Sequence, residues 1–82
     1  MLAQQFLEVS AKQRPGVLAL VCGEQRLAYR QLDGLANRFA HALRAHGIQR
    51  GDRVAILLDN SVEAVVAIFG TLKAGAVFNE GG

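Results

Sequence analysis

The chain has 82 residues, a formal net charge of +2 and a pI near 9.2, which leaves room for a single domain. Apolar residues make up 51% of the sequence, and the mean hydropathy is +0.21. A chain of this length buries only about 60–65% of the surface that its unfolded form exposes. Some of the apolar surface is therefore expected to meet a partner or further polypeptide, which predicts a truncated unit.

The positive charge lacks the distribution that is typical of nucleic-acid-binding proteins. Such proteins gather basic residues on one face and interleave aromatic side chains, whereas this chain has no Trp and one Tyr. Its arginines are scattered over several predicted elements: Arg14, Arg26, Arg30, Arg38, Arg44, Arg50 and Arg53. We therefore expect a solvated surface and no nucleic-acid partner.

The single cysteine, Cys22, excludes an internal disulfide and suits a reducing cytoplasm. It follows the apolar run 17–21, which favours a buried, unreactive thiol. The N-terminal residues lack the charged start and long apolar stretch of a signal peptide. The most apolar segment, 64–72, is far shorter than the ~20 residues that a membrane-spanning helix needs. We predict a cytoplasmic protein without a membrane span.

The first half of the chain predicts a helix over residues 2–13, then a hairpin. The residues that recur near helical period are Leu2, Phe6, Val9 and Gln13. Pro15-Gly16 ends this helix. Residues 17–22 then read as a buried strand, and Gly23-Glu24 turns the chain into the alternating residues 25–29 to close a tight hairpin.

A long helix is predicted over residues 30–46. Its apolar stripe occupies positions i, i+3, i+4, i+7 and i+11: Leu32, Leu35, Ala36, Phe39 and Leu43. Arg44 and His46 lie in its last turn, where cations interact favourably with the helix dipole. Gly47 is expected to end the helix.

The rest of the chain predicts a strand, a helix and a strand. After the Gly51-Asp52 turn, the continuous apolar run 54–58 indicates a strand that helices cover on both faces. A helix from Ser61 to Lys73 follows, and residues 76–78 begin another strand. This order predicts a right-handed βαβ crossover on a parallel sheet.

The predicted fold class is therefore α/β, an incomplete parallel-sheet unit with an N-terminal helix, a β-hairpin and a right-handed βαβ crossover. The crossover helix is apolar almost all round: Val62, Ala64, Val65, Val66, Ala67, Ile68, Phe69 and Leu72. Such a helix is normally buried on more than one side, and so few other elements cannot bury it fully.

Several catalytic motifs are incomplete. Gly70 and Gly75 have the spacing of a P-loop, but Ala76-Val77 follow where Lys and Ser/Thr are required, and these glycines end a helix. No Gly-x-Gly-x-x-Gly follows a strand, and no Gly-x-Ser-x-Gly is present. His41 and His46 point to different sides of one helix, so we expect surface histidines and no metal site. Ser10 and Ser61 sit beside helix ends, where capping is their common role.

Acidic and polar residues gather around the strand of residues 54–58: Asp52, Asp59, Asn60, Ser61 and Glu63. Ligands of open α/β sheets bind at the carboxyl ends of strands, so Asp59, Asn60 and Ser61 are the local candidates for contacting a ligand. Capping of the next helix explains the same residues without a ligand, because Asn60 with Glu63 resembles a capping box. Capping is the interpretation that we favour.

Five segments, in order over about residues 6–79, resemble the N-terminal region of the adenylate-forming (AMP-binding) superfamily. They are Leu27-Ala28-Tyr29-Arg30-Gln31-Leu32, Leu35-Ala36-Asn37-Arg38-Phe39-Ala40, Gly47-Ile48-Gln49-Arg50-Gly51-Asp52-Arg53-Val54-Ala55-Ile56, Asp59-Asn60-Ser61-Val62-Glu63 and Leu72-Lys73-Ala74-Gly75-Ala76-Val77. The family contains acyl-CoA synthetases, peptide-synthetase adenylation domains and luciferases. Phe78-Asn79 favours the acyl-CoA synthetase branch over the peptide-synthetase branch, which usually has Tyr-Val-Pro there.

The resemblance implies ATP-dependent activation of a carboxylic acid to an acyl-adenylate, followed by transfer to CoA or a carrier thiol. ATP, Mg and CoA are implied for the parent enzyme. The family's phosphate loop, ribose-binding Asp and catalytic Lys lie downstream, so no catalytic, cofactor-binding or metal-binding residue can be carried over to this chain. The family continues with Asn-Pro, whereas this chain continues as Asn79-Glu80-Gly81-Gly82.

Residues 1–82 are thus expected to form a single truncated N-terminal subdomain that is not catalytic by itself. Its expected partner is the remainder of the parent enzyme or a second copy. The alternative is a self-associating interaction module, a homodimer that pairs through the open edge of its sheet.

Overall fold

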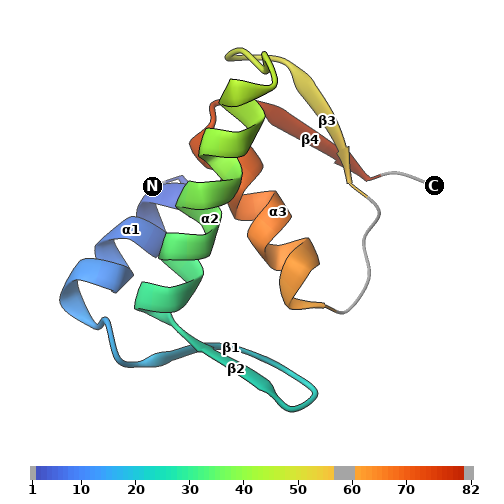
Figure 1. Ribbon diagram of the computed structural model, residues 1–82. Coiled ribbons are helices and arrows are strands. Elements are labelled where there is room, and N and C mark those ends of the chain that lie inside the picture. Colours follow the sequence, from blue (N-terminus) through green and yellow to red (C-terminus); the bar gives the residue numbers. More distant parts are fainter. Residues whose placement is uncertain (1, 57–60, 81–82) are drawn as a thin grey trace.

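The computed structural model describes residues 2–56 and 61–80. Along the chain it has the helices α1 (Ala3–Gln13), α2 (Tyr29–Ala45) and α3 (Val62–Lys73), and the strands β1 (Leu18–Cys22), β2 (Gln25–Ala28), β3 (Arg53–Ile56) and β4 (Val77–Glu80). The three helices pack together, with a small two-stranded sheet at each end of the helical layer (Figure 1). The mixed α/β class and the order of elements are as the sequence predicts.

Strands β1 and β2 form the expected antiparallel hairpin. Cys22 pairs with Gln25 across the two-residue turn, where Gly23 has a φ of 59°. The backbone N–H of Tyr29 donates a hydrogen bond of 3.0 Å to the carbonyl of Val17, which joins the start of the hairpin to the start of α2. The hairpin therefore leads directly into the long helix.

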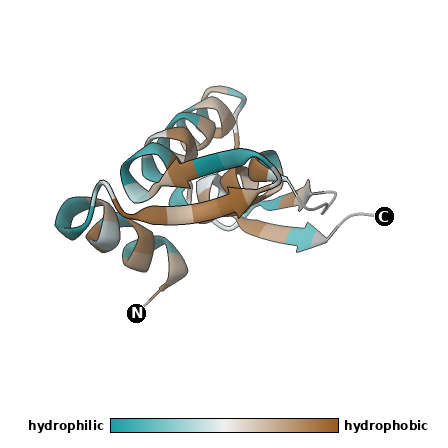
Figure 2. Cartoon of the chain, turned by 90° about the horizontal axis from the view of Figure 1, so that it is seen from below, coloured by the Kyte–Doolittle hydropathy of each residue, from teal (hydrophilic) through white to brown (hydrophobic). Residues whose placement is uncertain are grey.

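The strand predicted over residues 17–22 is present as β1, but the prediction that it is buried is wrong. Val17, Leu18 and Val21 are about half exposed, and Cys22 is only partly buried. The reason is that β1 belongs to a two-stranded sheet that contacts the helices on one side only. Figure 2 shows β1 as a largely hydrophobic strand beside the more hydrophilic start of β2.

The core lies where the helices meet. The buried cluster consists of Leu7 from α1 with Leu32 and Ala36 from α2, and partly buried side chains of the hairpin and of α3 pack against it. Gly70 lets α3 approach α2 closely, because an added Cβ there would lie 2.6 Å from Phe39 Cδ1 and 3.0 Å from the carbonyl oxygen of Ala36. The predicted stripe of α2 thus faces the core, as expected.

Helix α1 turns a different face inward from the one that its spacing indicates. Leu7 is 1% exposed and Ser10 is buried, whereas Phe6 is 53% exposed and Leu2 and Val9 also face outward. The ring of Phe6 meets that of Tyr29 edge to face, with 6.4 Å between the centroids. The spaced apolar residues of α1 therefore form an outer surface.

Strands β3 and β4 are parallel and joined by α3, with pairs running from Arg53–Val77 to Ile56–Glu80. Helix α3 packs against both strands. The prediction that helices cover both faces of the strand over residues 54–58 is wrong for its described part, because Ala55 of β3 is exposed. Residues 57 and 58 of the predicted run lie outside the described residues.

Candidate functional site

Of the three residues that the sequence offers as ligand contacts, the structure describes Ser61. It is the N-cap of α3, and its Oγ accepts a hydrogen bond of 3.1 Å from the backbone N–H of Ala64. The capping interpretation is thus confirmed for Ser61, but a capping box of Asn60 with Glu63 is wrong in register, because the third helical position is Ala64. Asp59 and Asn60 lie outside the described residues.

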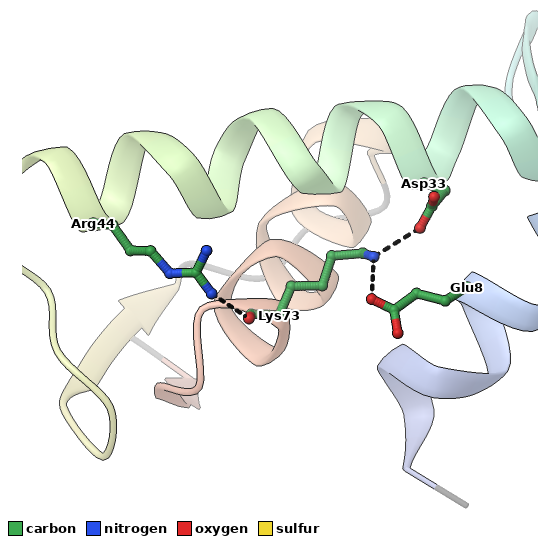
Figure 3. A network of polar contacts seen from close by, with 4 residues as sticks. All are labelled: Glu8, Asp33, Arg44 and Lys73. Atoms are coloured by element: carbon green, nitrogen blue, oxygen red, sulfur yellow. Dashed lines mark hydrogen bonds and ion pairs between the residues drawn. The ribbon is translucent and has the colours of Figure 1, made fainter.

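The most developed polar cluster lies elsewhere, between the three helices, and the sequence analysis missed it. Lys73 extends from the end of α3 between two carboxylates (Figure 3). Its Nζ lies 2.8 Å from Oε2 of Glu8 on α1 and 2.7 Å from Oδ1 of Asp33 on α2. One ammonium group therefore holds three helices together.

The three side chains of this cluster differ in how far they are exposed to solvent. The Lys73 side chain is 4% exposed, whereas those of Asp33 and Glu8 are 21% and 48% exposed. Burial lowers the pKa of the Lys73 ammonium, but hydrogen bonds and charge attraction from Asp33 and Glu8 more than offset it, so the pKa is raised above its ordinary value. A lysine held in its charged form is a poor nucleophile or general base, because both roles need the free amine.

Arg44 forms a hydrogen bond with the backbone at the same end of α3. Its Nη2 donates a hydrogen bond of 2.9 Å to the carbonyl oxygen of Lys73, one of the carbonyls that the end of α3 leaves without a helical partner. Arg44 lies in the last turn of α2, as predicted, and its guanidinium in addition binds the end of α3. His46 serves α2, with Nδ1 2.9 Å from the carbonyl oxygen of Ala42.

A hollow of about 730 Å³ lies beside Arg44 and Lys73, where α2 and α3 end. Among the residues that the structure describes, its lining includes five polar or charged side chains and no acidic one: Gln4, Arg44, Gln49, Arg50 and Lys73. The arginines have structural roles there, because Arg44 binds the end of α3 and the aliphatic part of Arg50 lies against Gly75. The negative ends of two helix dipoles also meet here, which opposes the binding of an anion.

The other residues that the sequence singled out are spread over the surface or the helices. Gly70 lies inside α3 and Gly75 follows its end with a φ of 79°, so this pair packs and terminates a helix. Ser10 lies in the last turn of α1, and its carbonyl accepts the N–H of Arg14. Within residues 2–56 and 61–80, no three His, Cys, Asp or Glu side chains gather as a metal site would require. No helix of that part of the chain is long and apolar enough to span a membrane.

Comparison with known proteins identifies the family of this chain. Residues 7–79 match the family model described as AMP-binding enzyme. The chain belongs to this family. The resemblance to adenylate-forming enzymes is thereby confirmed.

Relatives of this AMP-binding chain come from both branches considered above. It is 52% identical over 59 residues to the 3-hydroxybenzoate–CoA/4-hydroxybenzoate–CoA ligase of Thauera aromatica, a match that covers 72% of this chain and 11% of that protein. It is 44% identical over 78 residues to surfactin synthase subunit 2 of Bacillus subtilis, a match that covers 95% of this chain and 2% of that protein. The chain thus spans a small fraction of the length of the proteins it matches.

Solved structures agree with the AMP-binding assignment. The apo structure of Mycobacterium smegmatis MbtA superposes with a TM-score of 0.89 at 40% sequence identity, covering 95% of this chain and 15% of that one. The fold described above is therefore found, nearly complete, within a much longer adenylate-forming chain.

Proposed function

We propose that these residues form the N-terminal scaffold portion of an ATP-dependent ligase that joins a carboxylic acid to CoA or a carrier thiol through an acyl-adenylate. On this proposal the segment is not catalytic by itself. The observation that carries the proposal is the combination of the family match over residues 7–79 with a cluster, Glu8–Asp33–Lys73, whose charges are used to hold helices together.

The segment from Gly70 to Gly75, which has the glycine spacing of a P-loop, does not form a phosphate site. Binding of ATP phosphates needs backbone N–H groups or free cations, and Gly70 and Gly75 instead pack and end a helix. The ammonium of Lys73 is taken by two carboxylates. We therefore assign ATP, Mg and CoA to the parent enzyme and no cofactor to this segment. The acyl-CoA synthetase branch and a cytoplasmic location are part of the same proposal.

The first test is acid-dependent exchange between ATP and pyrophosphate, measured with the purified 82-residue chain. We expect no exchange above a blank without protein. Sustained exchange that requires an added carboxylic acid would overturn the assignment of the chemistry to another part of the parent enzyme.

A chimera tests the scaffold role directly. The matching segment of the Thauera aromatica ligase is replaced by residues of this chain, and ligation is measured with that enzyme's own acids. We expect activity within about tenfold of the parent, a change of about 1.4 kcal/mol in the barrier, because the two segments are 52% identical over 59 residues. A matched chimera carrying Gly70→Leu should lose activity together with folding. A chimera that folds, binds ATP and yet has no activity would contradict the proposal.

A second candidate function is self-association without enzymatic activity. It is favoured by the exposed apolar side chains on α1 and β1, among them Phe6 and Val21, and by the two small sheets with open edges. Light scattering over a range of concentrations distinguishes the two candidates. A mass twice that of the 8.8 kDa chain, reduced to one chain by Phe6→Glu with retained helicity, would support a homodimer.

A further inference from the structure

Among the described residues 2–56 and 61–80, nothing in the packing of this chain requires a glycine at position 34. It lies in the interior of α2 on the exposed side, and an added Cβ would meet nothing within 4 Å. Glycine in a helix interior is destabilising relative to alanine, so its presence calls for a reason. Gly70 has such a reason, because an added Cβ would collide with Phe39, but no described group of this chain supplies one for Gly34.

Two arginines flank this glycine on the same face of the helix. Arg30 and Arg38 lie four residues before and after Gly34, so they are about 12 Å apart along the helix axis. With Gly34 they line a hollow of about 320 Å³ whose other members are Leu27, Gln31 and Leu35. No acidic side chain lines it, and the ion pairs found within residues 2–56 and 61–80 all belong to Lys73.

We propose that this face of α2, which we call the Gly34 saddle (Leu27, Arg30, Gln31, Gly34, Leu35 and Arg38), docks an acidic helix of a partner protein. The partner helix would cross α2 at Gly34 and place carboxylates against Arg30 and Arg38. The inference does not depend on the adenylation chemistry proposed above.

The helical form of the partner follows from the geometry of the saddle. A glycine on a helix surface lets a second backbone come close at one point, with larger side chains on either side to fit its grooves. The chain itself contains this arrangement, since α3 approaches α2 through Gly70. The acidic character follows from charge: two guanidinium groups without ion-pair partners in the described structure match carboxylates in bidentate geometry.

The test uses the complete 82-residue chain and a synthetic alanine-rich helical peptide with glutamates eight positions apart, matching the spacing of Arg30 and Arg38. A control peptide has glutamine at those positions. Binding is followed by backbone amide and arginine Nε–H NMR signals. We expect the glutamate peptide to shift the signals of Gly34, Arg30 and Arg38, with an affinity that falls as salt is raised.

Variants separate the docking role from folding. The double change Arg30→Glu and Arg38→Glu should weaken binding by about fivefold to thirtyfold, whereas Arg14→Glu should leave it unchanged. Gly34→Ala should raise the Tm by about 4–8 °C and still weaken binding. Gly34→Leu should weaken it further, while Gly16→Leu, at another open glycine, should not.

Three results would overturn the proposal: equal binding of the glutamine peptide, shifts centred on Arg44 and Arg50, or no binding at millimolar peptide. Unchanged binding by a folded Gly34→Leu variant would also overturn it. If the glutamate peptide and a short single-stranded DNA shift the same signals equally, the saddle is a general anion surface and the helix-docking proposal fails.

Discussion

The helices and the strands of this chain differ in how much of their apolar surface is buried. Where α1, α2 and α3 meet, Leu7, Ala36 and Thr71 are almost completely buried, and Lys73 joins three helices with one charge. In the two small sheets, Leu18, Val21 and Val77 keep about half of their surface exposed. The difference indicates that the helices supply the stability of the unit, whereas the strands present surface for further packing.

This contrast predicts an uneven resistance to local opening. Backbone amides in regions with few buried apolar contacts exchange through small openings, and those in the core exchange only on larger unfolding. We therefore expect amides of α2 to be the most protected and those of the hairpin and of β3 and β4 to exchange faster. The five predictions below test the contrast, from the largest expected effect to the smallest.

The largest difference should appear between two leucines. Leu7→Ala removes a fully buried side chain from the meeting point of the helices and should lower the free energy of unfolding by about 3 kcal/mol. Leu18→Ala on β1 should cost less than about 1 kcal/mol, because Leu18 is already half exposed. Urea denaturation measures both, and similar losses at the two sites would remove the distinction between helices and strands.

The two glycines of the helices should respond to alanine in opposite directions. Gly70→Ala places a Cβ against Phe39 and the backbone of Ala36, so we expect a loss of about 2 kcal/mol from the strain of overpacking. Gly34→Ala meets open space and should gain up to about 1 kcal/mol through helix propensity. Thermal unfolding followed by circular dichroism gives the sign of each change. A loss of stability at both sites would contradict the assignment of Gly34 to helix propensity alone.

Lys73→Met tests the charged junction of the helices. Removing the ammonium leaves Asp33 and Glu8 facing each other without a cation, and we expect a loss of about 1–2 kcal/mol, since Glu8 remains half exposed and screened by water. Asp33→Asn should cost more than Glu8→Gln, because Asp33 is the less exposed partner. A double-mutant cycle between Lys73 and Asp33 measures the coupling, and a coupling of zero would contradict the role of the cluster.

The same cluster gives a pH dependence with a definite sign. Because the pKa of Lys73 is raised on folding, its contribution is fully present below the unfolded value near 10.5 and is lost as the pH rises through the higher folded value. Unfolding free energies measured above about pH 10.5 should therefore fall more steeply for the wild type than for Lys73→Met. Parallel pH curves for the two proteins would argue against this assignment.

Local patterns sufficed to predict the helices, the hairpin and the strand–helix–strand unit. Leu32 and Ala36 recur at helical spacing and are buried, and Gly47 follows the end of α2 with a φ of 90°. Such patterns identify an apolar stripe but not the element that covers it. This is why the helical spacing of Phe6 and Val9 does not reveal that Leu7 is the buried residue of α1.

The charged cluster could not be predicted in the same way, because Glu8, Asp33 and Lys73 are brought together by tertiary packing and have no common local motif. One signal was available: Lys73 is the single basic residue of the mostly apolar helix α3. A cation that is buried by such a helix needs a partner, although the sequence does not identify which carboxylates provide it.

The smallest predicted effect concerns how the helices begin. Ser61 caps α3 with its side chain, whereas the N-cap of α1 is Leu2, whose side chain cannot accept a hydrogen bond. The backbone N–H of Leu2 donates a hydrogen bond of 3.0 Å to Gln5 Oε1. Ser61→Ala should therefore lose about 1 kcal/mol, and Leu2→Ser, at a residue with the extended backbone of a cap, should gain about 0.5 kcal/mol. Ser61→Asp serves as the control, because its carboxylate keeps the acceptor and favours the positive end of the helix dipole, so it should retain stability. If Leu2→Ser lost stability instead, the exposed Leu2 would contribute to packing on the outer face of α1. That face would then belong to the packed part of the molecule and not to its exposed surface.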